Sequence, residues 1–457
     1  MNYAEFLTAK MSLPDERGVD PGELSPQLMP HQRDLVRWAL RKGRAAIFAD
    51  TGLGKTLMQL EWARRISEHG RVLVLAPLAV ASQTVAEGRR FGIDCEYARE
   101  DSGGIIVVTN YEMLDAFDPS QFVGVVLDES SILKAYDGKT RNAIIGTFAD
   151  TPYKLACTAT PAPNDFTELG NHSEFLGVRS RAEMLSEFFV HDGGSTQDWR
   201  LKGHAVGPFW DWVSSWGAIV RSPEDLGHDG GAYKLPPLRM HEHVVAIDHQ
   251  SQWESGNLFA PQASGLADAR KIRRETLESR ARKVAELCAG DEPAVVWCEL
   301  NAEADLCERL IEGAVQIKGS DSLDVKQERL EGFAAGRYRV LVTKPKIAGH
   351  GLNWQHCAKM AFFGASYSFE QTYQAIRRSW RFGQQRPVDV HILRAENEEH
   401  VIAAYRRKEA DAERLASEMA SRVRPAVRAD VAGESAPRWN EYNPNLCMEI
   451  PRWLKAA

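Results

Sequence analysis

The segment AAIFADTGLGKT (45–56) constrains the fold of this chain more than any other part of the sequence. An apolar run leads into a glycine loop, and the helical pattern LMQLEWARRI follows directly. The backbone N–H groups of such a loop, together with the positive end of the helix, form a cradle for anions. We expect Lys55 to reach the outer phosphates of a nucleotide and the Thr56 hydroxyl to ligate Mg²⁺. Thr51, Gly52 and Gly54 complete this predicted phosphate site.

An acidic strand end, GVVLDESS, follows the glycine loop after about 70 residues. Alone, two acids after an apolar run are often a solvated turn. Paired with a phosphate loop, they predict the groups that nucleotide hydrolysis needs. We expect Asp128 to hold Mg²⁺ through water, and Glu129 to position and deprotonate the attacking water.

Short runs rich in Val, Ile and Leu alternate with helical patterns in two parts of the chain. Continuous apolar runs of this length are typical of strands buried on both faces, and therefore of parallel sheets. The first part holds AAIFA (45–49), RVLVLAP (71–77), GIIVVTN (104–110), GVVLDES (124–130) and YKLACTAT (153–160). The second part holds PAVVWCEL (293–300), AVQIKG (314–319), YRVLVTK (338–344), KMAFFGA (359–365) and VDVHILRA (388–395). The pattern predicts an α/β fold of two doubly wound parallel-sheet lobes, over residues 30–165 and 267–400.

Three further segments complete the expected organisation. Residues 1–29 form an N-terminal segment, and residues 401–457 form a C-terminal helix and a proline-containing tail. Residues 166–266 are expected to be a mainly helical insertion and linker. That insertion is rich in aromatic residues: Phe188, Phe189, Trp199, Phe209, Trp210, Trp212 and Trp216. Base stacking by these rings is conceivable, but their helical spacing favours a place in the core.

Composition excludes several classes of protein. The 457 residues carry a net charge of −7, so a nucleic-acid site must come from local basic patches. The seven cysteines contain no CxxC pair, which argues against a zinc site and against a disulfide framework. The N-terminus lacks an apolar signal core, and no run approaches the length of a membrane span. We expect a soluble protein of the cytoplasm.

Four further segments resemble the motifs of superfamily 2 helicases and translocases, and of their Swi/Snf-like branch in particular. They are LMPHQRDLVRWAL (28–40), CTATPAPND (157–165), GHGLNWQ (349–355) and QAIRRSWRFGQ (374–384). The resemblance implies two RecA-like lobes that bind ATP and Mg²⁺ in the cleft between them. In this family Ala is tolerated at the first loop position, which Ala49 occupies here.

The resemblance also assigns roles to individual residues. Gln32 is expected to read the adenine edge, and Gly351 and Asn353 to contact the nucleotide. Thr158 and Thr160 are expected to link the ATP site to the nucleic-acid path. Arg378 and Arg381 fall on the two arginine positions that stabilise charge on the transferred phosphoryl group. The sequence departs from the family at His350 and at Arg377, where an acidic residue is frequent.

Phosphate contacts to nucleic acid are expected from loops at one end of each sheet. The candidates are Pro77, Ser82, Thr109, Asn110, Tyr111, Lys318, Gly319, Thr343, Lys344 and Lys346. A basic cluster between Arg270 and Lys283 is more simply a solvated helix face. The resemblance implies tracking along double-stranded DNA without regard to sequence, and forked or branched DNA is a further possible partner.

Three functions remain open from the sequence. The first is an ATP-dependent translocase or remodeller of double-stranded DNA. The second is a helicase that separates strands, remodels forks or anneals strands. The third is a nucleotide-gated DNA clamp or assembly subunit with little hydrolysis, against which Glu129 and the two arginines argue. The compact architecture suggests a bacterial, prophage or phage member serving replication, recombination or defence.

Overall fold

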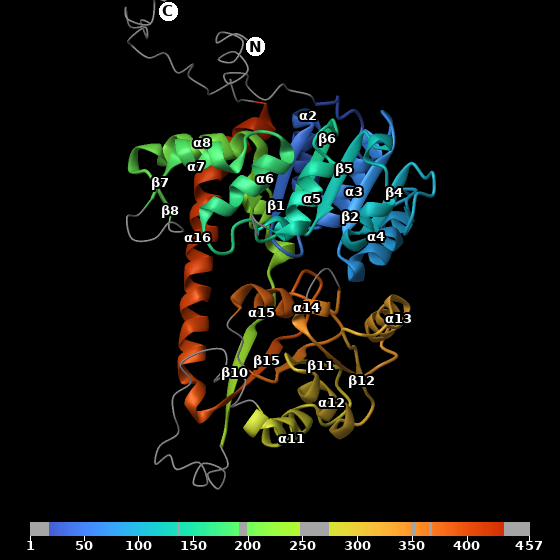
Figure 1. Ribbon diagram of the computed structural model, residues 1–457, viewed down its shortest axis with the longest axis vertical. Coiled ribbons are helices and arrows are strands. Elements are labelled where there is room, and N and C mark those ends of the chain that lie inside the picture. Colours follow the sequence, from blue (N-terminus) through green and yellow to red (C-terminus); the bar gives the residue numbers. More distant parts are fainter. Residues whose placement is uncertain are drawn as a thin grey trace, which may run out of the picture.

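The computed structural model describes residues 18–134, 138–191, 199–246, 274–348, 353–364 and 368–433. These residues form two α/β lobes, one above the other in Figure 1, each built on its own parallel sheet. The prediction of an α/β fold with two parallel-sheet lobes is confirmed. Each of the ten apolar runs identified in the sequence contains one strand.

Lobe 1 is built on a sheet with the strand order β3-β4-β2-β5-β6-β1-β9. Every residue of β2, β4 and β5 is buried, as expected for strands covered by helices on both faces. The strands are β1 (Arg44–Ala49), β2 (Val72–Ala76), β3 (Glu96–Tyr97), β4 (Ile106–Asn110), β5 (Gly124–Asp128), β6 (Tyr153–Cys157) and β9 (Gly217–Val220). The helices around them are α2 (Pro30–Lys42), α3 (Lys55–Ile66), α4 (Leu78–Arg90), α5 (Lys139–Thr147), α6 (Leu169–Leu176), α7 (Arg181–Phe188) and α8 (Val206–Trp216).

Lobe 2 is built on a sheet with the order β10-β15-β14-β11-β13-β12. Its strands are β10 (Leu238–Val245), β11 (Ala294–Trp297), β12 (Ala314–Gln316), β13 (Val340–Thr343), β14 (Lys359–Phe362) and β15 (Val388–Ala395). Its helices are α11 (Leu277–Leu287), α12 (Asn301–Leu310), α13 (Leu323–Ala334), α14 (Pro345–Ala348) and α15 (Phe369–Ile376). The basic cluster lies partly outside the described residues. Within α11, Arg280 is fully buried and pairs with Glu398, whereas Arg282 is exposed, so this helix is not a uniform basic face.

The segment expected as a helical insertion, 166–266, differs from that expectation in its described part. It does contain α6, α7 and α8, and the rings of Trp210, Trp212 and Trp216 are buried in the core of lobe 1. It also contains a small hairpin of β7 (Phe189–His191) and β8 (Trp199–Leu201). Beyond the hairpin, β9 pairs with β1 of lobe 1, and β10 pairs with β15 of lobe 2. The segment therefore completes both sheets.

A long last helix, α16 (Glu399–Ala432), runs along both lobes (Figure 1). Its first turns pack on lobe 2 through Val401 and Ile402, which contact Ile392. Its far end packs into the core of lobe 1 through Val423 and Val427. The helix continues through Pro425 to Ala432, because this end is buried against lobe 1 and packing outweighs the cost of the proline.

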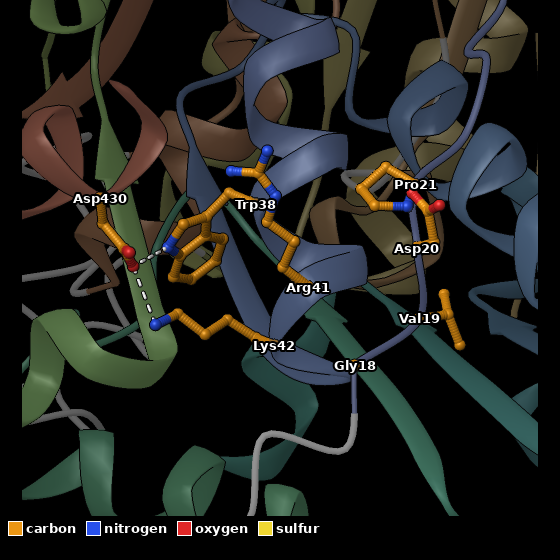
Figure 2. Close-up of a pocket in the computed structure, with 8 residues that line it drawn as sticks. All are labelled: Gly18, Val19, Asp20, Pro21, Trp38, Arg41, Lys42 and Asp430. Atoms are coloured by element: carbon orange, nitrogen blue, oxygen red, sulfur yellow. Dashed lines mark hydrogen bonds and ion pairs between the residues drawn. The ribbon is translucent and has the colours of Figure 1, made fainter. Parts of the chain in front are cut away.

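Asp430 anchors the end of α16 on lobe 1. Its carboxylate accepts a hydrogen bond of 2.8 Å from the Trp38 indole and pairs with the Lys42 ammonium at 2.8 Å. Figure 2 shows both contacts at the edge of a pocket that Gly18 and Arg41 also line. Asp430 thus fixes the C-terminal helix to the first helix of lobe 1.

The Asp430→Ala variant is expected to lower the free energy of unfolding by about 1–3 kcal/mol, because it leaves the buried Trp38 N–H without this acceptor. Urea denaturation followed by tryptophan fluorescence measures the change. Asp411→Ala, on the exposed middle of α16, is the matched control and should change stability by less than about 0.5 kcal/mol. Equal stability of the Asp430 variant and the control would contradict this account of the anchor.

None of the helices in the described part of the chain combines the length and the apolar character that crossing a membrane requires. The six cysteines among the described residues are buried and form no disulfide bonds with one another.

Candidate active site between the lobes

The phosphate loop lies between the end of β1 and the start of α3, as the strand–loop–helix pattern predicted. Gly52 and Gly54 have φ values of 92° and 83°, which favour glycine. A Cβ atom on Gly54 would lie 2.2 Å from the Gln32 side-chain nitrogen. Since α3 begins at Lys55, the N-terminus of the helix faces the loop. The local geometry is that of an anion cradle.

Lys55 lies close to three carboxylates. Its ammonium donates to the backbone oxygen of Ala49 at 2.9 Å. Burial lowers the pKa of Lys55, and the charges of Glu129, Asp50 and Asp128 oppose that shift. The structure therefore brings together the lysine and the two acids that the sequence predicted for one site.

Asp128 ends β5 and is held from two sides. The Gln59 amide donates to its carboxylate at 2.7 Å, and the Tyr111 hydroxyl donates to its backbone oxygen at 2.7 Å. Burial, reinforced by the neighbouring charge of Glu129, raises the pKa of Asp128 to about 6. Gln59 and Tyr111 were not predicted to support this acid, since only the folded chain brings them to it.

Glu129 is the single described residue other than glycine with a left-handed backbone, at φ 54° and ψ 52°. Such a conformation costs on the order of 1 kcal/mol or more and concentrates at functional sites. Its side-chain oxygen Oε2 is buried and has no hydrogen-bond partner among the described residues. A buried carboxylate oxygen without a partner, next to a phosphate loop, suits a group that binds water or substrate.

The residues expected to hold Mg²⁺ fit the ion. Thr56 and Asp128 offer a hydroxyl and a carboxylate, which are hard oxygen ligands. The described residues contain no group of three or more His, Cys, Asp or Glu that could hold a metal by itself. Mg²⁺ at phosphate sites is usually bound through one or two protein oxygens plus phosphates and water, so this donor set is of the appropriate kind.

Gln32, the expected adenine reader, is 5% exposed and contacts the phosphate loop. Its amide nitrogen donates to the Leu53 backbone oxygen at 3.0 Å, and its oxygen accepts from the Met29 N–H at 3.0 Å. The bond to Leu53 joins α2 to the loop, and the bond from Met29 caps the start of α2.

Two aromatic rings that the sequence did not predict for the site lie beside the loop. The rings of Tyr233 and Phe382 have centroids 4.7 Å apart with their planes tilted by 30°, and His31 meets Tyr233 edge-on at 5.3 Å. Phe382 directly follows Arg381, so its place in the arginine segment could have indicated a role. Nothing in the local sequence marks Tyr233, which comes from the connection between the lobes.

Arg378 and Arg381 lie in the turn that follows α15, within reach of the charges of the lobe 1 acids. Burial lowers the pKa of Arg378 to about 10, with the nearby charge of Arg381 acting in the same direction and Glu129 and Asp128 opposing it. Burial also lowers the pKa of Arg381, and Glu129 is among the charges that oppose this shift. A Cβ atom on Gly52 would lie 3.0 Å from the Phe382 nitrogen, so the arginine turn abuts the phosphate loop.

Gln374 links the arginine turn to the threonine segment of lobe 1. Its amide nitrogen lies 3.4 Å from the Thr160 hydroxyl, and its oxygens accept from the Arg378 guanidinium at 2.9 and 3.1 Å. Thr158 is buried, and its hydroxyl accepts from the Thr160 N–H at 3.2 Å. The threonine segment therefore contacts the arginine segment through one side chain.

The structure describes only part of the segment GHGLNWQ (349–355) of lobe 2. Gly351 lies outside the described residues. Asn353 is partly buried, and its side-chain oxygen has no hydrogen-bond partner among the described residues. The neighbouring Trp354 N–H donates to the Arg378 backbone oxygen at 2.9 Å, which ties this segment to the arginine turn.

The structure differs from expectation at one proposed nucleic-acid segment. Thr109, Asn110 and Tyr111 are all buried. Tyr111 holds the Asp128 backbone, and the Asn110 amide bonds with Tyr97 and Glu112. The reason is that β4 is an inner strand covered on both faces, so its end turns into the protein. These three side chains are not available to phosphates in this arrangement, and Thr343 of β13 is buried as well.

The other candidates for nucleic-acid contact reach the surface to different extents. Lys346 and Gly319 are exposed, and Pro77 is partly exposed at the start of α4. Lys318 pairs with Asp305 at 2.9 Å, and Lys344 donates to Asn301 at 2.6 Å. Ser82 accepts a hydrogen bond of 2.8 Å from Gln327 of lobe 2, so it lies where the lobes meet.

Two family models match the chain, one in each lobe. The model of the "Type III restriction enzyme, res subunit" matches residues 25–163, and that of the "Helicase conserved C-terminal domain" matches residues 279–383. The first range holds the phosphate loop and the acid pair, and the second holds both arginines.

Several known proteins are similar to this chain at low sequence identity. YwqA of Bacillus subtilis, provisionally named an ATP-dependent helicase/translocase, is 24% identical over 458 residues, covering 85% of this chain and 48% of YwqA. The SWI/SNF-related matrix-associated actin-dependent regulator of chromatin subfamily A-like protein 1 of Xenopus laevis is 26% identical over 38% of this chain and 20% of that protein. ZRANB3 of Mus musculus, a DNA annealing helicase and endonuclease, is 24% identical over 31% of this chain and 15% of ZRANB3. The chain therefore spans about half or less of the length of these relatives.

The two models fall on the two lobes in the order that the motifs require, and the relatives include helicases and a Swi/Snf-related protein. The chain belongs to the superfamily 2 helicases and translocases, and among its relatives it resembles a Swi/Snf-related protein.

Proposed function

We propose that the chain is a DNA-dependent ATPase that hydrolyses ATP between its lobes and uses the energy to move along double-stranded DNA. The observation that carries this proposal is the contact between the lobes at this site: the turn that holds Arg378 and Arg381 in lobe 2 abuts the phosphate loop of lobe 1, where a Cβ atom on Gly52 would lie 3.0 Å from the Phe382 nitrogen. A site completed by two lobes couples the chemistry to their relative motion.

Each side chain has a distinct role in the proposed reaction. Lys55 and the backbone of Thr51, Gly52 and Gly54 bind the phosphates. Thr56 and Asp128 would hold Mg²⁺, which supplies charge compensation between the phosphates when bound. Glu129 orients the attacking water and takes its proton on the partnerless oxygen.

The two arginines act late in the reaction. They offset the charge that develops on the γ-phosphoryl oxygens, a contribution of roughly 10³–10⁵ in rate for arginines of this type. Gln32, with Asn353 and Gly351, is proposed to complete the nucleotide site. Thr158 and Thr160 are proposed to transmit the state of the nucleotide site to the nucleic-acid path, with Gln374 as their contact to lobe 2.

DNA binding is proposed to use backbone contacts at the loop ends of both sheets. Pro77 and Ser82 of lobe 1 are candidates, together with Lys318, Gly319, Lys344 and Lys346 of lobe 2. Contacts of this kind would carry no base readout, so affinity should fall steeply with salt and vary little with sequence.

Two assays run in parallel test the proposed activity. A translocase displaces a third strand from a triplex in an ATP-dependent manner without separating the duplex strands. Strand separation at a fork, or annealing of separated strands, would instead favour a helicase or annealing activity, of the kind named for the mouse relative ZRANB3. Displacement in neither assay, with negligible ATP turnover on any DNA, would favour a nucleotide-gated clamp and contradict the proposal.

A further inference from the structure

An ion pair joins the phosphate loop of lobe 1 directly to the arginine turn of lobe 2. Asp50 is the residue between β1 and Thr51, and Arg377 immediately precedes Arg378. The Arg377 guanidinium donates to Asp50 Oδ2 at 2.6 Å.

Tyr373 on α15 completes the contact. Its hydroxyl donates to the other Asp50 oxygen, Oδ1, at 3.0 Å, and accepts from Arg377 Nε at 3.1 Å. The Arg377 guanidinium also lies over the rings of Tyr373 and Trp380, at 5.3 and 5.0 Å from their centroids. Lobe 2 therefore engages both oxygens of one loop carboxylate through a preorganised pair of side chains.

The ion pair is largely shielded from solvent. The side chains of Arg377 and Asp50 are 6% and 21% exposed. Burial alone would raise the pKa of the Asp50 carboxyl, but the Arg377 guanidinium, helped by the Thr51 N–H and the charge of Lys55, outweighs that effect and the pKa is lowered. By contrast, another pair between the lobes, Arg99 with Asp324, is 44% and 80% exposed. Exposed pairs are screened and contribute little, whereas losing one partner of a shielded pair is costly.

We propose that Arg377 is a positioning residue, which delivers Arg378 and Arg381 to the phosphate site by pairing with Asp50 when the lobes close. This inference rests on the proposed ATPase function. The Arg377 guanidinium is engaged by Asp50, so its proposed role is to place the turn that follows. Because the two members lie on different lobes, the pair exists only while the lobes are together, and it favours the arrangement in which the arginines face Glu129. The phosphate loop of lobe 1 thus both binds the phosphates and, through Asp50, holds the arginine turn of lobe 2 in place.

The test is a double-mutant cycle on duplex-stimulated ATP turnover. Asp50→Asn is chosen because an amide oxygen can still accept from the Thr51 N–H, a bond of 2.6 Å in the structure. Arg377→Gln is expected to lower kcat by about 10- to 100-fold, since it leaves Asp50 without its guanidinium partner when the lobes close. The KM for ATP should change by less than about threefold in either direction. The double variant should be at least about fivefold more active than the product of the two single effects predicts.

A readout of closure separates this role from a merely structural one. Fluorescence transfer between a dye on each lobe, with a non-hydrolysable ATP analogue and duplex DNA, should show less closure in Arg377→Gln and partial recovery in the double variant. Tyr373→Phe removes only the hydroxyl and should have an intermediate effect, which keeps the test informative if Arg377→Gln folds poorly. Arg99→Gln is the matched control at the exposed pair and should remain within about twofold of the unmodified protein.

The outcomes distinguish this inference from the proposed function. Single-variant effects that multiply without coupling, or unaltered closure in Arg377→Gln, would overturn the positioning role of Arg377 even if the protein is a DNA-stimulated ATPase. If duplex DNA fails to stimulate the unmodified protein, the proposed function fails, and the closure readout still reports whether the Asp50–Arg377 pair controls the lobes.

Discussion

Replacement of Glu129 by Gln is expected to lower kcat for ATP hydrolysis by roughly 10²–10⁴-fold while ATP and DNA binding are retained. The substitution keeps the shape of the side chain and removes the group that takes the proton from water. The buried oxygen Oε2 has no partner among the described residues, so no structural hydrogen bond of that atom is lost. The change also removes the negative charge that contributes to the raised pKa of Asp128.

Single-turnover hydrolysis measured beside equilibrium binding of an ATP analogue checks this expectation. Glu100→Gln is the matched control, because Glu100 is an exposed acid of lobe 1 away from the site and should leave turnover within about twofold. Hydrolysis by Glu129→Gln at the rate of the unmodified protein would remove Glu129 from the reaction.

Replacement of Arg381 by Ala is expected to lower kcat by roughly 10³–10⁵-fold, with a much smaller change in ATP affinity. The arginine comes from lobe 2, whereas the phosphate loop comes from lobe 1, so its loss should leave most ground-state binding intact. Arg378 is a less selective target. It is 1% exposed and its guanidinium is bonded to Gln374, so its removal also disturbs the packing of lobe 2.

The Arg381 variant is compared with Arg386→Ala, which removes an exposed arginine five residues further along the chain. That control should retain turnover within about twofold. Parallel loss of kcat and of ATP affinity in Arg381→Ala would point to a ground-state contact instead of a contribution to the transition state.

The apolar runs predicted most of the sheets because those strands are buried on both faces. β2, β4 and β5 are buried along their whole length, and such strands have no competing polar pattern. β10 escaped notice because it is an edge strand whose residues are mostly exposed or partly exposed, and its sequence LRMHEHVV lacks a continuous apolar run. β9 is only four residues long and directly follows the aromatic helix α8. Helix and strand therefore form one continuous apolar stretch, and the sequence gives no boundary between them.

The residues of the site could be predicted where they lie together in a short sequence motif. Lys55, the acid pair and the two arginines lie in such segments, and the fold brings them together. The supporting contacts were not predictable, since they join residues far apart in sequence: Gln59 with Asp128, and Arg377 with Asp50. Position in a motif also misled at Thr109–Tyr111, because a family segment does not reveal which side chains turn into the core.

The central claim is that ATP is cleaved only when the arginines of one lobe meet the phosphates held by the other, and that DNA promotes this meeting. Steady-state ATP turnover of the purified protein, titrated with a linear duplex at fixed salt, tests it most directly. A low basal rate that rises to saturation with duplex is expected. A rate that is the same at every duplex concentration, including none, would contradict it.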